Sequence, residues 1–299
     1  MVDALKGFIS NSERWDAFAF RDGDIVIATP AKCGTTWTQR IVSLLVFDSP
    51  ELYRPLSFIS PWLDMNTRPL DEVLADLDAQ THRRFVKSHL DFDHLPHRDD
   101  VTYITVGRDP RDAAVSWQHH EKNMNLDALF AARAAAVGLD DLAEVGGGSN
   151  DPPVDRTPAE AFWNWIEAPG EGFDNLVTHI KSYWRHRDAD NVVMLHYGDL
   201  QRDLPGQMAY LADRLGISLS RERIDELAPF ATFDAMKSDP ERNIPNIGIW
   251  NDGNEFFHKG ESGQWRALAT DDEMARYDKR VAELCDPELA HWLHHGTLG

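Results

Sequence analysis

Residues 32–37, Lys-Cys-Gly-Thr-Thr-Trp, lie between a short apolar run and a segment with helical spacing. The run at 24–29 is typical of a buried strand, and residues 38–47 repeat apolar side chains as one helix face does. A strand, a glycine-containing loop and a helix start can bind a phosphate, because loop amides and the helix dipole face the anion. A lysine adds a full positive charge. The sequence therefore predicts an anion site at residues 32–37.

The rest of the chain predicts one α/β domain over residues 1–299, with a central, mostly parallel sheet flanked by helices. Further strands are expected at 84–89, 101–106 and 191–197, and helices at 109–122 and 204–215. Ligands bind beyond the carboxyl ends of such strands. The residues at or just past those ends are Lys32, His89, Arg108 and Tyr197.

Composition narrows the function classes. The net charge of −20 disfavours nucleic acid and anionic membranes as partners over most of the surface. No stretch approaches the roughly 20 apolar residues of a membrane span, and residues 1–7 carry no signal-peptide pattern. The only two cysteines are Cys33 and Cys285, so we expect no disulfide framework and a cytoplasmic location.

Two segments remain open to interpretation. Residues 145–153 are rich in glycine and proline and predict a flexible loop, either a surface insertion or a lid over the substrate site. Residues 274–293 predict one amphipathic helix. The adjacent histidines 119–120 and 294–295 suggest metal pairs, but neighbours on a helix point in different directions, so we expect no metal site.

The order of residues in the anion loop separates it from common nucleotide sites. A Walker loop places its lysine after the last glycine, whereas here Lys32 precedes Gly34, and Thr35 and Thr36 follow. This order disfavours a standard ATP or GTP site. A kinase-like phosphotransferase and a non-catalytic nucleotide-binding protein remain as alternatives.

Residues 29–37 resemble the 5′-phosphosulfate loop of the cytosolic-type sulfotransferases. These enzymes transfer a sulfuryl group from 3′-phosphoadenosine 5′-phosphosulfate (PAPS) to an acceptor and release 3′-phosphoadenosine 5′-phosphate (PAP). Further segments resemble family motifs in the family's order, from residue 25 to about residue 266. They are 85–90, 103–116, 195–200, 233–237 and 256–265.

The resemblance implies roles for individual residues. His89 would be the general base, Lys32 would stabilise the leaving group, and Lys87 would assist electrostatically. Ser116 would hold the 3′-phosphate and restrain Lys32 until the acceptor arrives. The implied donor-binding set is Lys32, Cys33, Gly34, Thr35, Thr36, Trp37, Arg108, Ser116, Tyr197, Phe233, Met236, Phe257, His258, Lys259 and Gly260. No metal is required, and the acceptor would be a small, largely apolar molecule with a hydroxyl or amine.

The chain departs from the family pattern at three places. Cys33 stands where the family has serine, and a thiol beside a lysine and a helix start is either reactive or a small space-filling group. His258 stands where the family has arginine, so we expect donor affinity to weaken as pH rises through its titration. The dimer motif of many animal members is missing, so a homodimer would need another interface.

Overall fold

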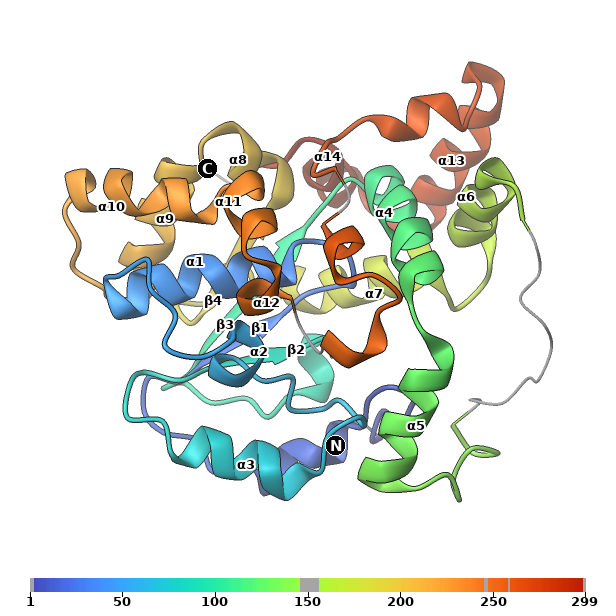
Figure 1. Ribbon diagram of the computed structural model, residues 1–299. Helices are drawn as coiled ribbons and strands as arrows, with labels where there is room; N and C mark the ends of the chain where they lie inside the picture. Colours follow the sequence, from blue (N-terminus) through green and yellow to red (C-terminus); the bar gives the residue numbers. More distant parts are fainter. Residues whose placement is uncertain (1–2, 146–155, 245–246, 258, 298–299) are drawn as a thin grey trace.

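The computed structural model describes residues 3–145, 156–244, 247–257 and 259–297, which form a parallel four-stranded sheet between helices (Figure 1). The sheet order is β2-β1-β3-β4, so β1 and β3 lie in the centre of the sheet. Strand pairing aligns Ile25 with Phe85 and with Thr102, and Tyr103 with Val192. The predicted α/β class is confirmed. The strands are β1 (Ile25–Ala28), β2 (Phe85–Ser88), β3 (Thr102–Gly107) and β4 (Val192–His196).

The helices comprise α-helices and short 3-10 helices. The α-helices are α1 (Thr35–Phe47), α2 (Leu56–Ile59), α3 (Leu70–Asp78), α4 (Pro110–Asn123), α5 (Leu126–Val137), α6 (Pro158–Glu167), α7 (Gly172–Trp184), α8 (Tyr197–Arg202), α9 (Leu204–Arg214), α10 (Arg221–Leu227), α11 (Phe233–Ser238), α12 (Pro240–Asn243), α13 (Asp271–Leu284) and α14 (Pro287–His295). The 3-10 helices are η1 (Ser12–Ala17), η2 (Phe92–His94), η3 (Ala228–Ala231), η4 (Ile247–Ile249), η5 (Gly253–Phe256) and η6 (Gln264–Ala267).

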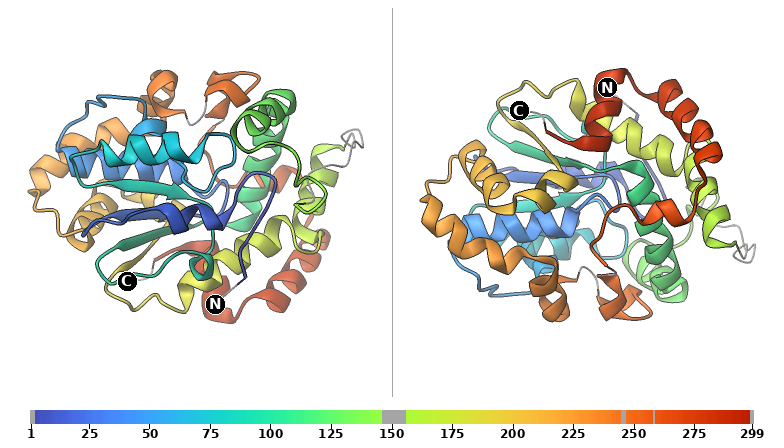
Figure 2. Two further views of the ribbon diagram at one scale, coloured as in Figure 1. Left: turned by 90° about the horizontal axis from the view of Figure 1, so that it is seen from below. Right: turned by 90° about the horizontal axis from the view of Figure 1, so that it is seen from above.

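Alternation along the strands divides the core between the two sheet faces. Ile25 and Ile27 of β1 join one buried cluster, with side chains from α1, α9 and α10. Val26 and Ala28 join a second cluster, with side chains from α4, α6, α7 and α14. The two helical layers enclose the sheet in both views of Figure 2. All four β1 side chains are buried, as expected of a central parallel strand.

Three connections at the carboxyl ends of the strands place the site. Strand β1 ends at Ala28, and helix α1 begins at Thr35 after the loop of residues 29–34. Helix α4 follows β3 directly, with Asp109 as its N-cap and Pro110 in its first turn. Helix α8 begins at Tyr197, the first residue after β4. Lysine, arginine and tyrosine side chains of these connections therefore reach the same edge of the sheet.

The C-terminal segment corrects one prediction. The single helix expected over 274–293 is wrong, because α13 ends at Leu284 and α14 begins at Pro287. Pro287 has no N–H to continue the first helix, and its ring would clash with the preceding turn. Asp286 caps the second helix by accepting a hydrogen bond from the Leu289 amide at 2.8 Å.

Two further predictions concern the segment 145–153 and the lack of a membrane span. Most of the segment 145–153, predicted as a loop or lid, lies outside the described residues. Within the described ranges, every helix is too short or too polar to cross a bilayer.

Candidate active site

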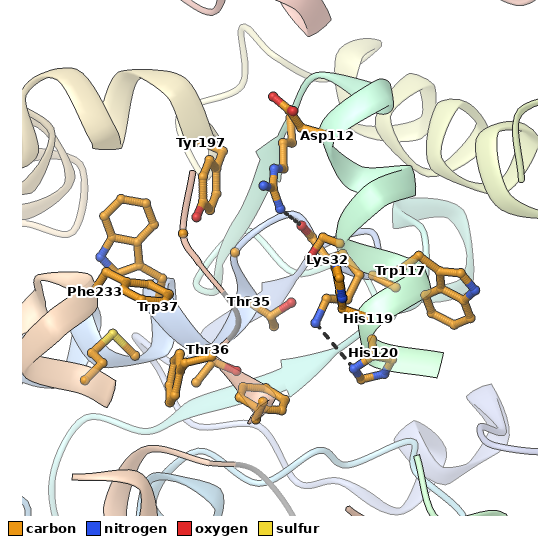
Figure 3. A pocket seen from close by; sticks show the side chains of 18 of the residues that line it. Lys32, Thr35, Thr36, Trp37, Asp112, Trp117, His119, His120, Tyr197 and Phe233 are labelled. Atoms are coloured by element: carbon orange, nitrogen blue, oxygen red, sulfur yellow. Dashed lines mark hydrogen bonds between the residues drawn. The ribbon is translucent and has the colours of Figure 1, made fainter. Parts of the chain in front are cut away.

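A cavity of about 650 Å³ lies at the carboxyl edge of the sheet and gathers the predicted residues (Figure 3). They come from every motif that the sequence singled out, although these motifs are far apart along the chain. The predicted residues that line it are Lys32, Gly34, Thr35, Thr36, Trp37, Lys87, His89, Arg108, Ser116, Tyr197, Phe233, Met236, Phe257, Lys259 and Gly260. His258 lies outside the described residues.

The loop after β1 presents an uncapped helix start to the cavity. Gly34 is the N-cap of α1 and has a φ of 106°, a left-handed conformation that favours glycine. Among the described residues, no side chain caps the first turn, so its amides keep their donors for a ligand. The Thr35 hydroxyl is 2.5 Å from the Thr29 hydroxyl, which ties the helix start to the end of β1.

Cys33 is the described residue of the predicted donor set that turns away from this cavity. Its side chain is fully buried, and burial raises the pKa of the thiol to about 12. Its amide donates to the Pro30 carbonyl oxygen at 3.3 Å. Burial and the raised pKa favour the space-filling interpretation of Cys33 over the reactive one, because a thiol with so high a pKa is a poor nucleophile.

Lys32 is held at both its backbone and its side chain. Its φ of 66° is rare for a residue with a side chain, and its carbonyl oxygen accepts a hydrogen bond from Arg108 Nη1 at 2.8 Å. Its Nζ lies 3.3 Å from His120 Nδ1 and 5.2 Å from the ring centroid of Phe256. Burial, together with the charges of Arg108 and Lys87, lowers the pKa of Lys32 to about 7.

Arg108 offers an unsatisfied donor to the cavity. Its side chain packs over the Tyr197 ring at 4.1 Å, and the residue is only 6 % exposed. Its Nε is buried and has no hydrogen-bond partner among the described residues. A buried guanidinium N–H normally has a partner, so this atom indicates a ligand with an oxygen acceptor such as a phosphate.

Aromatic side chains form a slot beside Arg108. Trp37 donates through Nε1 to the Ala231 carbonyl oxygen at 2.7 Å and meets Tyr197 at a centroid distance of 5.1 Å. Gly260 closes the other side with a φ of 67°, and a Cβ there would lie 2.4 Å from a ring carbon of Phe233. The close approach leaves flat aromatic faces for a base to stack on.

His89 is fixed in one tautomer. Its Nδ1 lies 2.7 Å from the Thr29 carbonyl oxygen, which can only accept, so Nδ1 carries the hydrogen. Nε2 is then the nitrogen with a free lone pair. Burial, with the charge of Lys87 nearby, lowers the pKa of His89 well below its usual value. The ring is therefore neutral near pH 7 and able to accept a proton from an ordered hydroxyl.

Trp62 connects His89 with Lys87. Its ring meets the His89 ring edge to face at 4.6 Å, and the Lys87 Nζ lies 4.2 Å from its centroid. Its Nε1 donates to the buried carboxylate of Asp64 at 2.9 Å. Burial lowers the pKa of Lys87 to about 8, with Asp64 opposing that shift.

The contact between Lys32 and His120 was not predicted from the sequence. His120 was considered only as half of an adjacent histidine pair, yet its ring lies beside Lys32 in the cavity wall. Within the part of the chain that the structure describes, no three His, Cys, Asp or Glu side chains gather as a metal group. Trp250 and Phe256 also line the cavity, Trp250 from an isolated bridge and Phe256 from the end of the short 3-10 helix η5, and neither position carries a periodic signal in the sequence. The aromatic residues Phe162, Trp163 and Trp165 of α6 pack in the buried core.

Comparisons with known proteins agree with these motifs. The family model described as "Sulfotransferase domain" matches residues 22–290. The chain is 43 % identical to a glycolipid sulfotransferase of Mycobacterium bovis, over 98 % of this chain and 94 % of the relative. It is 26 % identical to an amine sulfotransferase of Oryctolagus cuniculus, over 91 % and 83 % of the two chains.

Solved structures share the fold. A retinol dehydratase in a complex with retinol and PAP has a TM-score of 0.71 and 24 % identity, and covers 92 % of this chain and 84 % of its own. A mouse sulfotransferase complexed with PAP has a TM-score of 0.70 and 20 % identity, over 98 % and 96 % of the two chains.

Proposed function

The chain belongs to the sulfotransferase family, and from this premise we propose that it sulfates a hydroxyl of a glycolipid-like amphiphile with PAPS as donor. The observation that carries the proposal is one cavity that joins an unsatisfied Arg108 to a neutral, oriented His89. The guanidinium of Arg108 suits a nucleotide phosphate, and the imidazole of His89 suits removal of a proton from a hydroxyl. PAP would be the product, and no metal would take part.

The cavity residues fit a nucleotide with an anion at each end. The first-turn amides of α1 and the Lys32 ammonium would receive the 5′ end. Arg108, Ser116 and Lys259 would receive the 3′-phosphate, and Trp37 and Phe233 would stack on adenine. A thermal-shift titration tests this assignment: stabilisation by PAP is expected, and stabilisation by ATP but not by PAP would favour the phosphotransferase alternative.

The chain's own residues account for the transfer step. His89 Nε2 takes the proton of the acceptor hydroxyl as the acceptor oxygen forms its bond to sulfur. The donor supplies the sulfuryl group and a phosphate whose bridging oxygen keeps the electron pair of the broken S–O bond. Lys32 stabilises the negative charge that grows on that oxygen, and the positive charge of Lys87 stabilises the negative charge on the oxygens of the transferred sulfuryl group. Positioning and charge stabilisation supply the catalysis.

The acceptor end of the cavity supports an amphiphilic substrate. Met65, Leu129 and Ile249 form a buried apolar cluster separate from the two main cores, and each also lines the cavity. Trp62 and Met124 pack against the same cluster and line the cavity too. An acceptor with an apolar portion would pack there and place its hydroxyl near His89. The names of the relatives at 43 % identity favour a glycolipid, and an amine acceptor remains an alternative.

His89→Ala tests the proposal directly. We expect kcat with PAPS and a galactosyl- or glucosylceramide to fall by about 10²–10⁴-fold, the usual contribution of a general base. PAP affinity by calorimetry serves as the control and should change little, because the donor groups are intact. Turnover near that of the wild type would show that His89 is not the base. No transfer by the wild type to any glycolipid, steroid or phenol would contradict the acceptor assignment.

A cytoplasmic location and a homodimer remain proposals. The location is supported by Cys33 and Cys285, which are both buried and free of any disulfide. Light scattering of the purified chain tests the dimer.

A further inference from the structure

The side chain of Lys32 reaches the acceptor side of the cavity and ends against His120 (Figure 3). The Nζ of Lys32 lies 3.3 Å from the Nδ1 of His120 and 5.2 Å from the ring centroid of Phe256. When Lys32 is protonated its ammonium only donates hydrogen bonds, so His120 then accepts through Nδ1 and carries its own hydrogen on Nε2. His120 must therefore be neutral to make this contact.

The His120 ring is held in place by aromatic neighbours. It packs against Trp250 at a centroid distance of 4.8 Å and against Trp117 at 5.4 Å, with Phe256 at 6.4 Å. Trp117 belongs to the same helix, whereas Trp250 and Phe256 come from the segment that covers the acceptor end. Burial and the charge of Lys32 lower the pKa of His120 to about 2, so the ring stays neutral at any pH where the enzyme would work.

We propose that His120, in place of the Ser116 that the family resemblance implies for this role, is a positioning residue that holds the Lys32 ammonium on the acceptor side and competes for it with the leaving group of the donor. This proposal rests on the proposed function. One hydrogen bond to a neutral ring is modest, whereas a bond to an oxygen that gains negative charge is stronger. Lys32 therefore leaves His120 as charge develops, and an acceptor that fills the space by Phe256 and Trp250 favours that exchange.

The competition for the Lys32 ammonium also affects the enzyme when donor is bound without an acceptor. Without an acceptor, water could attack sulfur, release sulfate and leave PAP, with its proton passing to His89 and the S–O electron pair to the bridging oxygen. Lys32 stabilises that leaving oxygen as well. Because His120 holds the ammonium away from the bridging oxygen, it slows this hydrolysis of the donor more than it slows sulfuryl transfer to an acceptor. Loss of the hydrogen bond should therefore change the ratio of hydrolysis to transfer.

Three substitutions separate the hydrogen bond from the shape of the ring. His120→Phe keeps a ring but has no acceptor. The amide oxygen of His120→Asn can take the place of Nδ1, whereas the amide of His120→Gln reaches the place of Nε2. We expect the ratio of acceptor-free sulfate release to transfer to rise about five-fold in H120F and H120Q, the effect of one ordinary hydrogen bond. H120N should stay near the wild-type ratio.

The ratios of hydrolysis to transfer in these variants can support or contradict the role of His120. An unchanged ratio in H120F, or an H120N ratio equal to that of H120Q, would overturn it. If H120F fails to fold, judged by its melting temperature, the contrast between the Asn and Gln variants still tests the position of the acceptor atom. A wild type that never transfers sulfuryl groups would instead contradict the proposed function.

A second measurement does not depend on activity. The ¹⁵N spectrum of ring-labelled histidines should show His120 as the Nε2–H tautomer, with its Nδ1 signal moved by the hydrogen bond from Lys32. PAP, whose 5′-phosphate attracts the ammonium, should shift that signal toward the value of a free ring nitrogen in the wild type but not in Lys32→Met. A signal that PAP leaves unchanged in the wild type would overturn the proposal.

Discussion

At the nucleotide end of the cavity, Arg108 is held by a backbone carbonyl and an aromatic ring, whereas at the transfer end Lys32 and Lys87 are held chiefly by neutral or aromatic groups. The guanidinium of Arg108 stays charged, because this group is not deprotonated in proteins. The lysines have lowered pKa values of about 7 and about 8. In the proposed function, one end binds a fixed anion, and the other responds to a charge that appears during the reaction.

The largest effect that would test this difference comes from Lys32→Met. We expect kcat to fall by about 10²–10³-fold, as when an oxyanion donor is removed, because the growing charge on the leaving oxygen loses its cation. The KM for PAPS should rise far less. Steady-state assays with varied PAPS measure both. Lys87→Met, which alters a neighbouring cation, is the matched control and should cost less in kcat. A large rise in KM with kcat unchanged would show that Lys32 only binds.

A smaller effect with the opposite pattern is expected for Arg108. In Arg108→Gln, PAP affinity should fall by about 10–100-fold, the usual loss for hydrogen bonds from a charged group, with a modest effect on kcat. Calorimetric titration with PAP measures it. Arg108→Lys keeps the charge but loses the planar fork, so an intermediate loss is expected. Equal affinity in all three proteins would remove the 3′-phosphate from this site.

The smallest expected effect is a pH dependence. Bound phosphate favours the protonated lysines, so it raises their pKa values and PAP binding takes up protons. PAP affinity should therefore be highest near pH 7 and fall between about pH 7 and 9, by at most about ten-fold per lysine per pH unit. Titrations in two buffers with different ionisation enthalpies reveal the proton uptake.

The pH profile also separates the two ends. Lys32→Met should flatten its lower step near pH 7, while Arg108→Gln should lower affinity at every pH without changing the shape. A fall centred nearer pH 6.5 would instead report His258, whose titration the sequence predicts to matter. A flat profile from about pH 6 to 9 would contradict both interpretations.

Much of the nucleotide end was predictable because its residues follow strands in recognisable order. Arg108 directly follows β3 and Tyr197 directly follows β4, and parallel strands bring their carboxyl ends together. The transfer end was predictable only in part. His120 was missed because its partner Lys32 is 88 positions away in the sequence, and no pattern within a helix encodes such a contact.

Other differences between the sequence-based predictions and the structure have local physical causes. The thiol of Cys33 faces the core because the loop backbone turns it there, and residue type alone does not fix that direction. The tail was expected as one helix because apolar periodicity continued across Pro287, although proline overrides periodicity. Phe256 ends the short 3-10 helix η5 and Trp250 lies in an isolated bridge, and the paths of such short elements depend on tertiary contacts.

The backbone of Lys32, at a φ of 66°, sets a trade-off between robustness and turnover. Glycine or asparagine would occupy this left-handed position at a lower conformational cost, and neither would bury a cation. Selection for a more stable fold would therefore replace this residue, whereas selection for sulfuryl transfer would retain it if Lys32 has the proposed role. An engineer who screened for thermostability alone would be led toward a more heat-resistant, inactive protein, so any such library should leave position 32 fixed.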